Sequence, residues 1–261
     1  MGTMDAGRLA ALNSGTEPAR NLAECLAVDQ AALARNSLPA LGFGDAAEVV
    51  AQAAEAGKPT GISRQMGAIA EAAIGVLSGM PAPSALIDAM AAHPSDTVRS
   101  WAAFAAGRID ADAPLTARLE AMRRFAADGH FGVREWAWLA VRPFIARDVA
   151  GAIGTLTPWT ADPDPNIRRF AVESTRPRGV WCEHLKILKE TPALAEPLLT
   201  PLNADPARYV QDSVANWLND ASKSQPQWVI GLCEAWGTRS DSTATRRIVE
   251  RALRTLRKAA A

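Results

Sequence analysis

A short turn followed by a helix-like segment recurs four times between residues 93 and 223. The copies align on a β-branched residue, namely Val98, Val133, Ile167 and Val210, and are therefore 35, 34 and 43 residues apart. Such periods are typical of helical-repeat solenoids, in which one repeat cannot bury its apolar face alone and must stack on its neighbours. The spacing therefore predicts an all-α, HEAT-like helical-repeat solenoid, that is, an α-α superhelix.

The predicted solenoid is a single domain over residues 1–261. N-terminal helices are expected in 1–92, the best-defined repeats in 93–223 and C-terminal helices in 224–261. Apolar periodicity, with Pro and Gly at the joints, predicts the individual helices. They are expected at 5–35 (one or two helices), 45–56, 63–77, 84–92, 95–107, 114–127, 131–146, 148–156, 165–175, 181–189, 194–202, 207–221, 226–236 and about 243–258.

Counting from the β-branched residue separates two faces of the repeat helices. Positions +3, +4 and +7 are mainly apolar and predict a buried seam: Trp101, Ala102, Ala105, Trp136, Ala137, Ala140, Phe170, Ala171, Ser174, Ser213, Val214 and Trp217. Positions +2, +6 and +9 form a mainly polar stripe, which is expected to face the groove of the solenoid: Glu135, Leu139, Arg142, Arg169, Glu173, Arg176, Asp212, Asn216 and Asn219.

The charge of the chain is unevenly distributed, although its formal net charge is zero. Residues 1–95 carry 5 Lys and Arg against 9 Asp and Glu, whereas residues 96–261 carry 23 against 19. All 8 Trp also follow residue 100. The net charge demands neither a nucleic acid nor a membrane as partner, but positive charge and large aromatic side chains share the repeat region.

Cysteine usage indicates a reducing compartment. Cys25, Cys182 and Cys233 are far apart, odd in number and lack a CxxC spacing, which argues against a disulfide framework and a thiolate zinc site. No metal and no cofactor are expected. His93 and His130 occupy turns, where they are expected to be solvated or to cap a helix. The chain shows no signal peptide and no membrane span, so a cytoplasmic monomer is expected.

A strip of arginines follows the third turn. Arg168, Arg169, Arg176 and Arg178 are separated by one or two helical turns, and the run ends at Trp181. Arginine pairs with phosphate groups through two parallel hydrogen bonds, so the strip is a candidate site for a nucleic-acid backbone. The alternative is a solvated helix face in which Glu173 is an internal partner.

Longer motifs in the same region resemble a known family. The runs from Arg168 to Cys182 and from Asp205 to Lys223 resemble the AlkC-type alkylpurine DNA glycosylases, as do 12–15, 22–26 and 133–137. The resemblance extends from about residue 10 to residue 258. It implies a HEAT-like solenoid whose basic concave groove binds duplex DNA. Many members carry an immunoglobulin-like domain after the solenoid, and this chain is expected to lack one because no strand-like segment follows the repeats.

The resemblance also implies an activity and the residues that perform it. Members excise cationic 3-methyl and related N-alkyl purines from duplex DNA without flipping the base fully into a pocket. The catalytic roles fall on Glu135, Asp220 and Trp181. The DNA-binding roles are expected at Arg134, Arg168, Arg169, Arg176, Arg178, Trp138 and Lys223.

The chemistry of these residue types agrees with that activity. A cationic purine leaves without a general acid, so what needs stabilising is the developing oxocarbenium ion of the sugar, which a carboxylate can provide. The alternatives are an exposed Glu135 paired with Arg134 or Arg142, a surface Asp220 held by Lys223, and a Trp181 in the core. A non-catalytic HEAT-like scaffold or DNA-binding protein is the alternative function.

Overall fold

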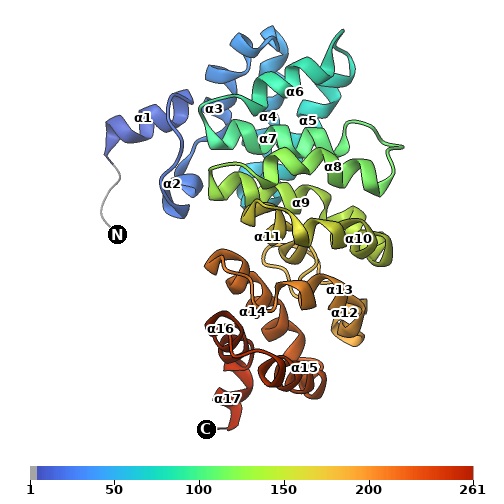
Figure 1. Cartoon of the computed structure of the whole chain (residues 1–261). Coiled ribbons are helices and arrows are strands. Elements are labelled where there is room, and N and C mark those ends of the chain that lie inside the picture. Colours follow the sequence, from blue (N-terminus) through green and yellow to red (C-terminus); the bar gives the residue numbers. More distant parts are fainter. Residues whose placement is uncertain (1–4, 261) are drawn as a thin grey trace. The chain divides into compact units, whose positions relative to one another are not determined.

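The computed structural model describes residues 5–260, and over these residues it contains α-helices and short 3-10 helices but no strand (Figure 1). The prediction of an all-α chain is confirmed. The chain divides into two compact units, one that extends to Ala140 and one that begins at Val141. Between residues 5 and 260 the structure has no helix that is both long and apolar enough to cross a membrane.

The first unit is a stack of helices that pack through small apolar side chains. Its elements are α1 (Ala6–Ser14), α2 (Leu22–Ala27), α3 (Gln30–Ser37), η1 (Pro39–Leu41), η2 (Gly44–Ala46), α4 (Ala47–Gly57), η3 (Lys58–Thr60), α5 (Ile62–Ser78), α6 (Pro83–Ala91), α7 (Asp96–Arg108), α8 (Leu115–Ala126) and the start of α9 (Phe131–Arg147). Helix α4 packs on α3 and α5, and α7 packs on α5, α6 and α8. Ala51 and Ala54 of α4 and Ala70 and Ala73 of α5 are fully buried, which lets the helices approach closely.

The second unit continues the helical pattern with shorter elements. They are the end of α9, α10 (Val149–Leu156), η4 (Thr157–Ala161), α11 (Pro165–Glu173), α12 (Lys186–Glu190), η5 (Pro192–Ala195), α13 (Glu196–Leu199), η6 (Thr200–Leu202), α14 (Arg208–Ser222), α15 (Pro226–Arg239), α16 (Thr243–Ala252) and α17 (Arg254–Ala260). Helix α14 packs on α11, α15 and α16. Trp217 of α14 is fully buried and donates its indole N–H to the Thr175 carbonyl at 3.0 Å, which satisfies its polar atom inside the core.

The residue that follows each β-branched anchor closes its own turn. In all four repeats its side chain donates a hydrogen bond to the carbonyl oxygen of the residue five positions before the anchor. The bonds run from Arg99 to His93 at 2.9 Å, from Arg134 to Asp128 at 2.6 Å, from Arg168 to Asp162 at 2.8 Å and from Gln211 to Asp205 at 2.8 Å. The four repeats therefore share this side-chain hydrogen bond, which the spacing of the anchor residues alone did not predict.

Two of these arginines also connect one repeat to the next. Within the first unit, Arg99 donates two hydrogen bonds to the carboxylate of Asp128, at 2.8 and 3.1 Å. Within the second unit, Arg168 donates two to Asp205, at 2.6 and 3.0 Å, and the Asp205 side chain is 3% exposed. Such two-pronged arginine–carboxylate pairs are geometrically specific, so each fixes the position of the next turn.

Histidine takes part in the same turns. The Nδ1 atom of His93 accepts the backbone N–H of Ser95, and that of His130 accepts the N–H of Gly132, each at 3.1 Å. The carboxylates of Asp128 and Asp205 accept the N–H of the second residue after them in the same way. Of the two expected roles, solvated or capping, these bonds to backbone N–H groups beside the starts of α7 and α9 favour capping.

Several helix boundaries differ from the predicted ones. Three helices rather than one or two occupy 5–35, and the last basic helix is interrupted at Leu253. The helix predicted at 181–189 begins only at Lys186, because residues 177–185 form a loop closed by a hydrogen bond from Leu185 N to Pro177 O at 3.1 Å. The helix predicted at 194–202 breaks into short turns, since the proline at the start of each turn cannot donate to a preceding one.

The predicted seam and stripe are also partly wrong. Trp136 was placed in the buried seam but is partly exposed and packs against Phe104, with ring centroids 5.9 Å apart. Glu173 and Asn219 were placed on a stripe facing an open groove, yet both are buried. They contact the neighbouring helix: Glu173 of α11 bonds Ser213 of α14, and Asn219 of α14 bonds Ala252 of α16.

Candidate functional site

In the second unit, Arg176 lies between two buried carboxylates. It follows α11 and donates from Nε and Nη2 to Oδ2 of Asp220, at 2.9 and 2.7 Å, and from Nη1 to Oε1 of Glu173, at 2.7 Å. Glu173 ends α11 and Asp220 lies near the end of α14, so the arginine joins the two helices. The side chains of Glu173 and Asp220 are only 5% and 6% exposed. The three residues form a network of two acids and one arginine.

Glu173 is ionised in this environment despite its burial. Burial raises the pKa of its carboxyl, but Arg169, Arg176 and a hydrogen bond from Ser213 outweigh that effect and hold the pKa below its ordinary value. Burial likewise lowers the pKa of Arg176, yet Glu173 and Asp220 together raise it above the usual value. The network therefore holds one arginine cation and an ionised Glu173 inside the protein.

Sequence reasoning did not assign Glu173 to catalysis, although it placed the residue beside the arginine strip. The signal that was available is its spacing of three from Arg176, which places both side chains on one face of a helix. Ser213 lies 40 residues from Glu173 in the sequence, so residue spacing could not predict this contact.

Asp220 presents its two oxygens differently. Oδ2 accepts both bonds from Arg176, whereas Oδ1 lies 3.3 Å from Nζ of Lys223, whose side chain is 43% exposed. Asp220 is thus held by Lys223, as one alternative expected, but it is buried rather than on the surface. Its backbone carbonyl accepts a hydrogen bond from Nε of Arg178 at 3.2 Å, and Arg178 also bonds Ser224 at 2.6 Å.

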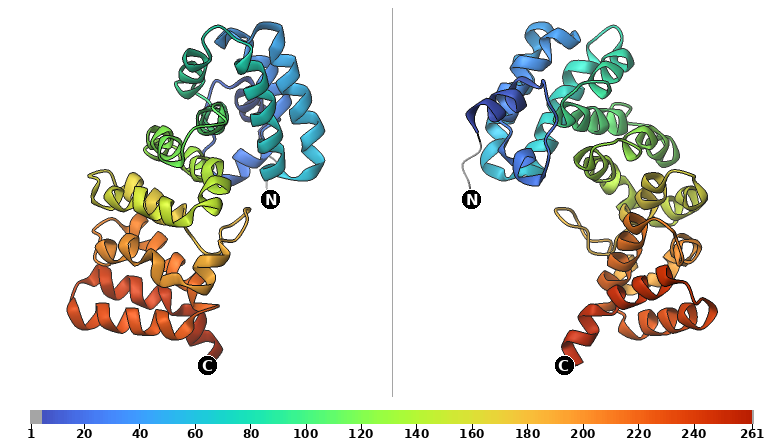
Figure 2. Two further views of the ribbon diagram at one scale, coloured as in Figure 1. Left: turned by 90° about the vertical axis from the view of Figure 1, so that its right-hand side faces the viewer. Right: turned by 60° about the vertical axis from the view of Figure 1, so that its left-hand side comes forward.

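Trp181 lies on the loop between α11 and α12, which leaves the helices of the second unit (Figure 2). Its side chain is exposed, at 51%, so the core alternative for Trp181 is wrong. Its φ of 61° is in the left-handed region, an unusual conformation for a bulky residue that persists where the surroundings impose it. Two residues earlier, a Cβ added at Gly179 would clash with Sγ of Cys182, so the loop requires glycine there.

Arg142 anchors both ends of this loop. The guanidinium is buried and donates to three backbone carbonyls: Ser174 at 2.6 Å, Arg176 at 2.6 Å and Glu183 at 3.1 and 3.3 Å. Its predicted place on an open polar stripe is wrong, because the side chain fills the interior of the loop. By these bonds one arginine fixes the residues on either side of Trp181.

In the first unit, Glu135 and Trp138 lie one turn apart on α9. The indole N–H of Trp138 donates to Oε2 of Glu135 at 3.0 Å, and the Trp138 ring is 3% exposed. The hydrogen bond orients the carboxylate from its own helix. Trp138 is therefore a buried residue that positions Glu135, rather than a side chain on the helix surface.

The predicted DNA-binding arginines have different surroundings. Arg168 is engaged by Asp205 and by the carbonyls of its own turn, which favours a structural role over phosphate binding. Arg169 is buried and stacks on Tyr209, with the guanidinium carbon 4.3 Å from the ring centroid. Lys223 is exposed. We therefore expect the exposed Lys223 to be better placed for phosphate contacts than Arg168, whereas Arg178 is engaged by the Asp220 carbonyl and Ser224.

Comparisons with known proteins agree with the fold. No model of a known protein family matches the chain. The uncharacterised protein YhaZ of Bacillus subtilis (strain 168) is 38% identical over 120 residues, which make up 46% of this chain and 33% of YhaZ. Alkylpurine DNA glycosylase AlkC of Pseudomonas fluorescens, solved bound to DNA containing an abasic-site analogue, matches with a TM-score of 0.70 and 26% identity, over 92% of this chain and 66% of AlkC.

Two further structures share the fold. AlkD2 from Streptococcus mutans matches with a TM-score of 0.60 and 21% identity, over 80% of this chain and 98% of that protein. The protein smu.31 from Streptococcus mutans UA159 matches with a TM-score of 0.58 and 22% identity, over 78% of this chain and 95% of that protein. The resemblance to AlkC-type alkylpurine DNA glycosylases and the helical-repeat fold are thus confirmed, while the chain spans only part of YhaZ and of AlkC.

Proposed function

We propose that the chain is a DNA glycosylase that excises cationic N-alkylated purines of the 3-methyladenine type from duplex DNA. The observation that carries the proposal is the buried network of Glu173, Arg176 and Asp220, in a fold shared with AlkC. A scaffold has no need to bury two carboxylates around one arginine, because such a network contributes little net stability.

The proposed reaction is hydrolysis of the N-glycosidic bond. A purine alkylated at N3 or N7 already carries positive charge, so it departs without a proton from the protein. The sugar becomes an oxocarbenium-like cation, which ionised carboxylates stabilise, and water then attacks the anomeric carbon. We assign the stabilising charge and the orientation of this water to Asp220 and Glu135, and the contact with the lesion's nucleotide to Trp181.

The environment of Asp220 suits this role. Arg176 occupies one carboxylate oxygen, and the other is paired with the exposed Lys223. A carboxylate fixed on one side is preorganised and needs little rearrangement during the reaction. Because the oxygens of Asp220 are held in the protein, the lesion would be reached at its sugar, which agrees with excision without full base flipping.

A non-catalytic HEAT-like scaffold or DNA-binding protein is the second candidate. The observation that favours it is the pairing of Arg99 with Asp128 and of Arg168 with Asp205, which places arginines of the repeat in structural contacts. Such contacts are expected of any stacked repeat protein. They explain these arginines but leave the Glu173, Arg176 and Asp220 network without a purpose.

The test is release of the free base from methylated duplex DNA, followed by chromatography for 3-methyladenine. Wild type is expected to release the base, and Asp220→Asn to release it far more slowly. Asp212→Asn is a matched control, because Asp212 lies on the same helix but pairs with Arg247 and Arg251 at a partly exposed position. Wild type that binds DNA and releases no base would favour the scaffold. Equal loss in both variants would show damage to α14 rather than to chemistry.

A further inference from the structure

Three potential metal ligands meet in the first unit. Cys25 lies on α2, Asp96 is the first residue of α7, and His130 directly precedes α9. One atom of each side chain can act as a ligand, and these atoms lie within 4.8 Å of one another. Oδ2 of Asp96 is 3.4 Å from Nδ1 of His130 and 3.8 Å from Sγ of Cys25.

The hydrogen bonds of His130 define which ring nitrogen carries the proton. Nε2 lies 2.7 Å from the carbonyl oxygen of Ala19, and because a carbonyl only accepts, Nε2 must be the protonated nitrogen. Nδ1 is then the unprotonated nitrogen, and its single lone pair accepts the N–H of Gly132 at 3.1 Å, a bond that an ion at Nδ1 would replace. That lone pair lies 3.4 Å from the Asp96 carboxylate oxygen. Two electron-rich atoms at this distance are stabilised by a cation placed between them.

The Ala19 peptide orients two of the three ligands. Its N–H donates to Oδ1 of Asp96 at 2.8 Å and its carbonyl accepts from His130, so Oδ2 and Nδ1 are the atoms turned toward Cys25. A metal-ligating histidine usually donates its other ring N–H to a carbonyl or carboxylate, and ligating carboxylates are themselves hydrogen-bonded. The Asp96 side chain is 5% exposed, and buried charges are normally paired or coordinate metals.

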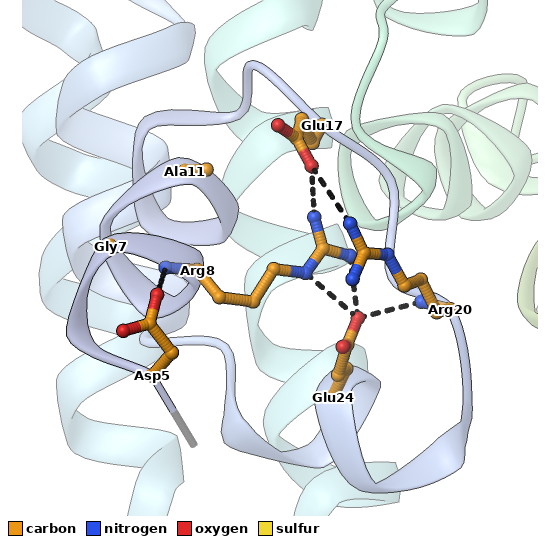
Figure 3. Close-up of a pocket in the computed structure, with 7 residues that line it drawn as sticks. All are labelled: Asp5, Gly7, Arg8, Ala11, Glu17, Arg20 and Glu24. Atoms are coloured by element: carbon orange, nitrogen blue, oxygen red, sulfur yellow. Dashed lines mark hydrogen bonds and ion pairs between the residues drawn. The ribbon is translucent and has the colours of Figure 1, made fainter.

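The segment that carries Ala19 is itself held in place. Figure 3 shows Arg8 reaching between Glu17 and Glu24, to which it is paired. Arg8 also donates to the Pro18 carbonyl at 2.6 Å, and Glu24 accepts the backbone N–H of Arg20 at 2.7 Å. Because Glu24 directly precedes Cys25, the same ion pairs fix both the Ala19 peptide and the cysteine.

We propose that Cys25, Asp96 and His130 form a zinc-binding site with water as the fourth ligand. Zinc takes sulfur, imidazole nitrogen and carboxylate oxygen at about 2.0–2.3 Å in a tetrahedron, so its ligand atoms are separated by roughly 3.3–3.8 Å. The 3.4 and 3.8 Å separations already match this spacing. The ion binds the cysteine as a thiolate, and the thiol proton goes to solvent. It would join α2, α7 and the start of α9, the helix that carries Glu135.

The test uses the full-length chain, freed of metal and titrated with Zn²⁺ by calorimetry, and with Co²⁺ by absorption spectroscopy. Wild type is expected to bind one ion per chain, to gain thermal stability from Zn²⁺, and to show a thiolate-to-Co²⁺ charge-transfer band. Cys25→Ser keeps a donor for Asp96, and Asp96→Asn keeps an acceptor for the Ala19 N–H, so both variants retain hydrogen bonds that the fold uses. Both are expected to lose the site. Cys182→Ser is the control, since Cys182 lies on the loop of the second unit, and it is expected to bind like wild type.

Two outcomes would overturn the proposal. Wild type that binds no stoichiometric Zn²⁺ excludes the site outright. Binding that is equal in wild type and Cys25→Ser, or a charge-transfer band that Cys182→Ser alone removes, places the metal elsewhere. Should a variant unfold, the absorption of Cys182→Ser and Cys233→Ser with Co²⁺ still decides, because a thiolate band that survives both substitutions leaves Cys25 as the ligand and a band that either one removes places the metal elsewhere. DNA binding and base release are not part of this readout, so the two proposals fail independently.

Discussion

Asp220 and Glu135 are the residues at which the proposed chemistry can be tested most directly. If both stabilise one sugar cation, removing either charge slows excision by about 100- to 1000-fold, the usual cost of losing one preorganised electrostatic partner. DNA binding should stay the same or become tighter, because an acid that repels phosphate is gone. The measurement is single-turnover release of 3-methyladenine by wild type, Glu135→Gln, Asp220→Asn and the double variant.

The double variant carries the sharper information. When two groups stabilise one transition state, their effects on the rate are not independent. The fold loss of rate in the double variant, relative to wild type, should therefore be smaller than the product of the two single fold losses. Glu234→Gln is a suitable control, because Glu234 is an exposed acid on α15. Single variants with wild-type rates would remove both residues from the mechanism, even if the protein releases the base.

Glu173 gives a prediction about acid stability. Its pKa is lower in the folded protein than the ordinary value of 4.5, so the ionised form stabilises the fold at higher pH. This contribution is complete above the unfolded-state pKa and is lost as the pH falls through the folded-state pKa. The difference in unfolding free energy between wild type and Glu173→Gln should therefore be largest near neutral pH and shrink below about pH 4.5.

Urea unfolding at a series of pH values measures this difference. Glu190→Gln serves as control, because the Glu190 side chain is 62% exposed and pairs with Lys186 on the surface. It should change the unfolding free energy little at any pH, as expected for an exposed ion pair. A Glu173→Gln curve that runs parallel to wild type through the acid range would mean that the fold does not lower the pKa of Glu173.

Sequence reasoning reached some of these residues and missed others for physical reasons. Asp220 and the arginine strip were found because the motifs carry them as residue types at fixed spacing. Glu173 and Arg142 were misplaced because periodicity reports which face of a helix a residue occupies, not which neighbour covers that face. The cluster of Cys25 with Asp96 was equally hidden, since its members are 71 residues apart in sequence.

At the scale of elements, periodicity predicted helices far better than it predicted loops. The ends of α7, α9 and α14 lie within one residue of the predicted ones, because each helix follows the recurring turn that the sequence marks. The loop that carries Trp181 was predicted as helix. Its shape depends on Arg142 and on the contact of Gly179 with Cys182, which are tertiary interactions. The left-handed φ of Trp181 has no signature in the residue type itself.

The pairing of Arg168 with Asp205 predicts how one repeat is fixed to the next. Arg168→Ala should lower the unfolding free energy by about 2 kcal/mol, the scale of a hydrogen bond to a charged group. Asp205→Ala should cost less on the Arg168→Ala background than on its own, because the shared pair is already broken and the bond from the Ala207 N–H is what it still removes. Urea unfolding of the four proteins forms the double-mutant cycle.

The pair of Arg124 with Asp88 is the matched control for this cycle. It is also an arginine–aspartate pair between helices, but its side chains are 46% and 64% exposed. Exposed pairs contribute about 0–1 kcal/mol, so Arg124→Ala should be nearly neutral. Equal losses in Arg168→Ala and Arg124→Ala would contradict the structural role of Arg168 and return it to the set of candidate phosphate ligands.

At the scale of the whole molecule, the class of fold was predictable and the arrangement of charge was not. The repeat period and the motif resemblance were sufficient for an all-α repeat protein. Net charge of zero, in contrast, conceals the local pairing of most repeat arginines with aspartate and backbone carbonyls. The number of cations left for DNA is therefore smaller than the count of 23 Lys and Arg after residue 95 suggests.

The salt dependence of DNA affinity measures that number. Each cation that neutralises a phosphate contributes about −0.9 to the slope of log affinity against log salt concentration. Lys223→Ala should lower the magnitude of the slope by about 0.9 and weaken binding alike on all sequences. Arg168→Ala should leave the slope unchanged, because Asp205 and backbone carbonyls engage its guanidinium.

Fluorescence anisotropy of a labelled duplex over a range of KCl concentrations provides the slopes. Lys186→Ala is the control, since its side chain is 87% exposed and takes no part in the network around Asp220. Affinity that does not respond to salt would exclude phosphate binding by the chain. A slope that falls in Arg168→Ala but not in Lys223→Ala would reverse the division between structural and DNA-binding cations drawn from their hydrogen bonds.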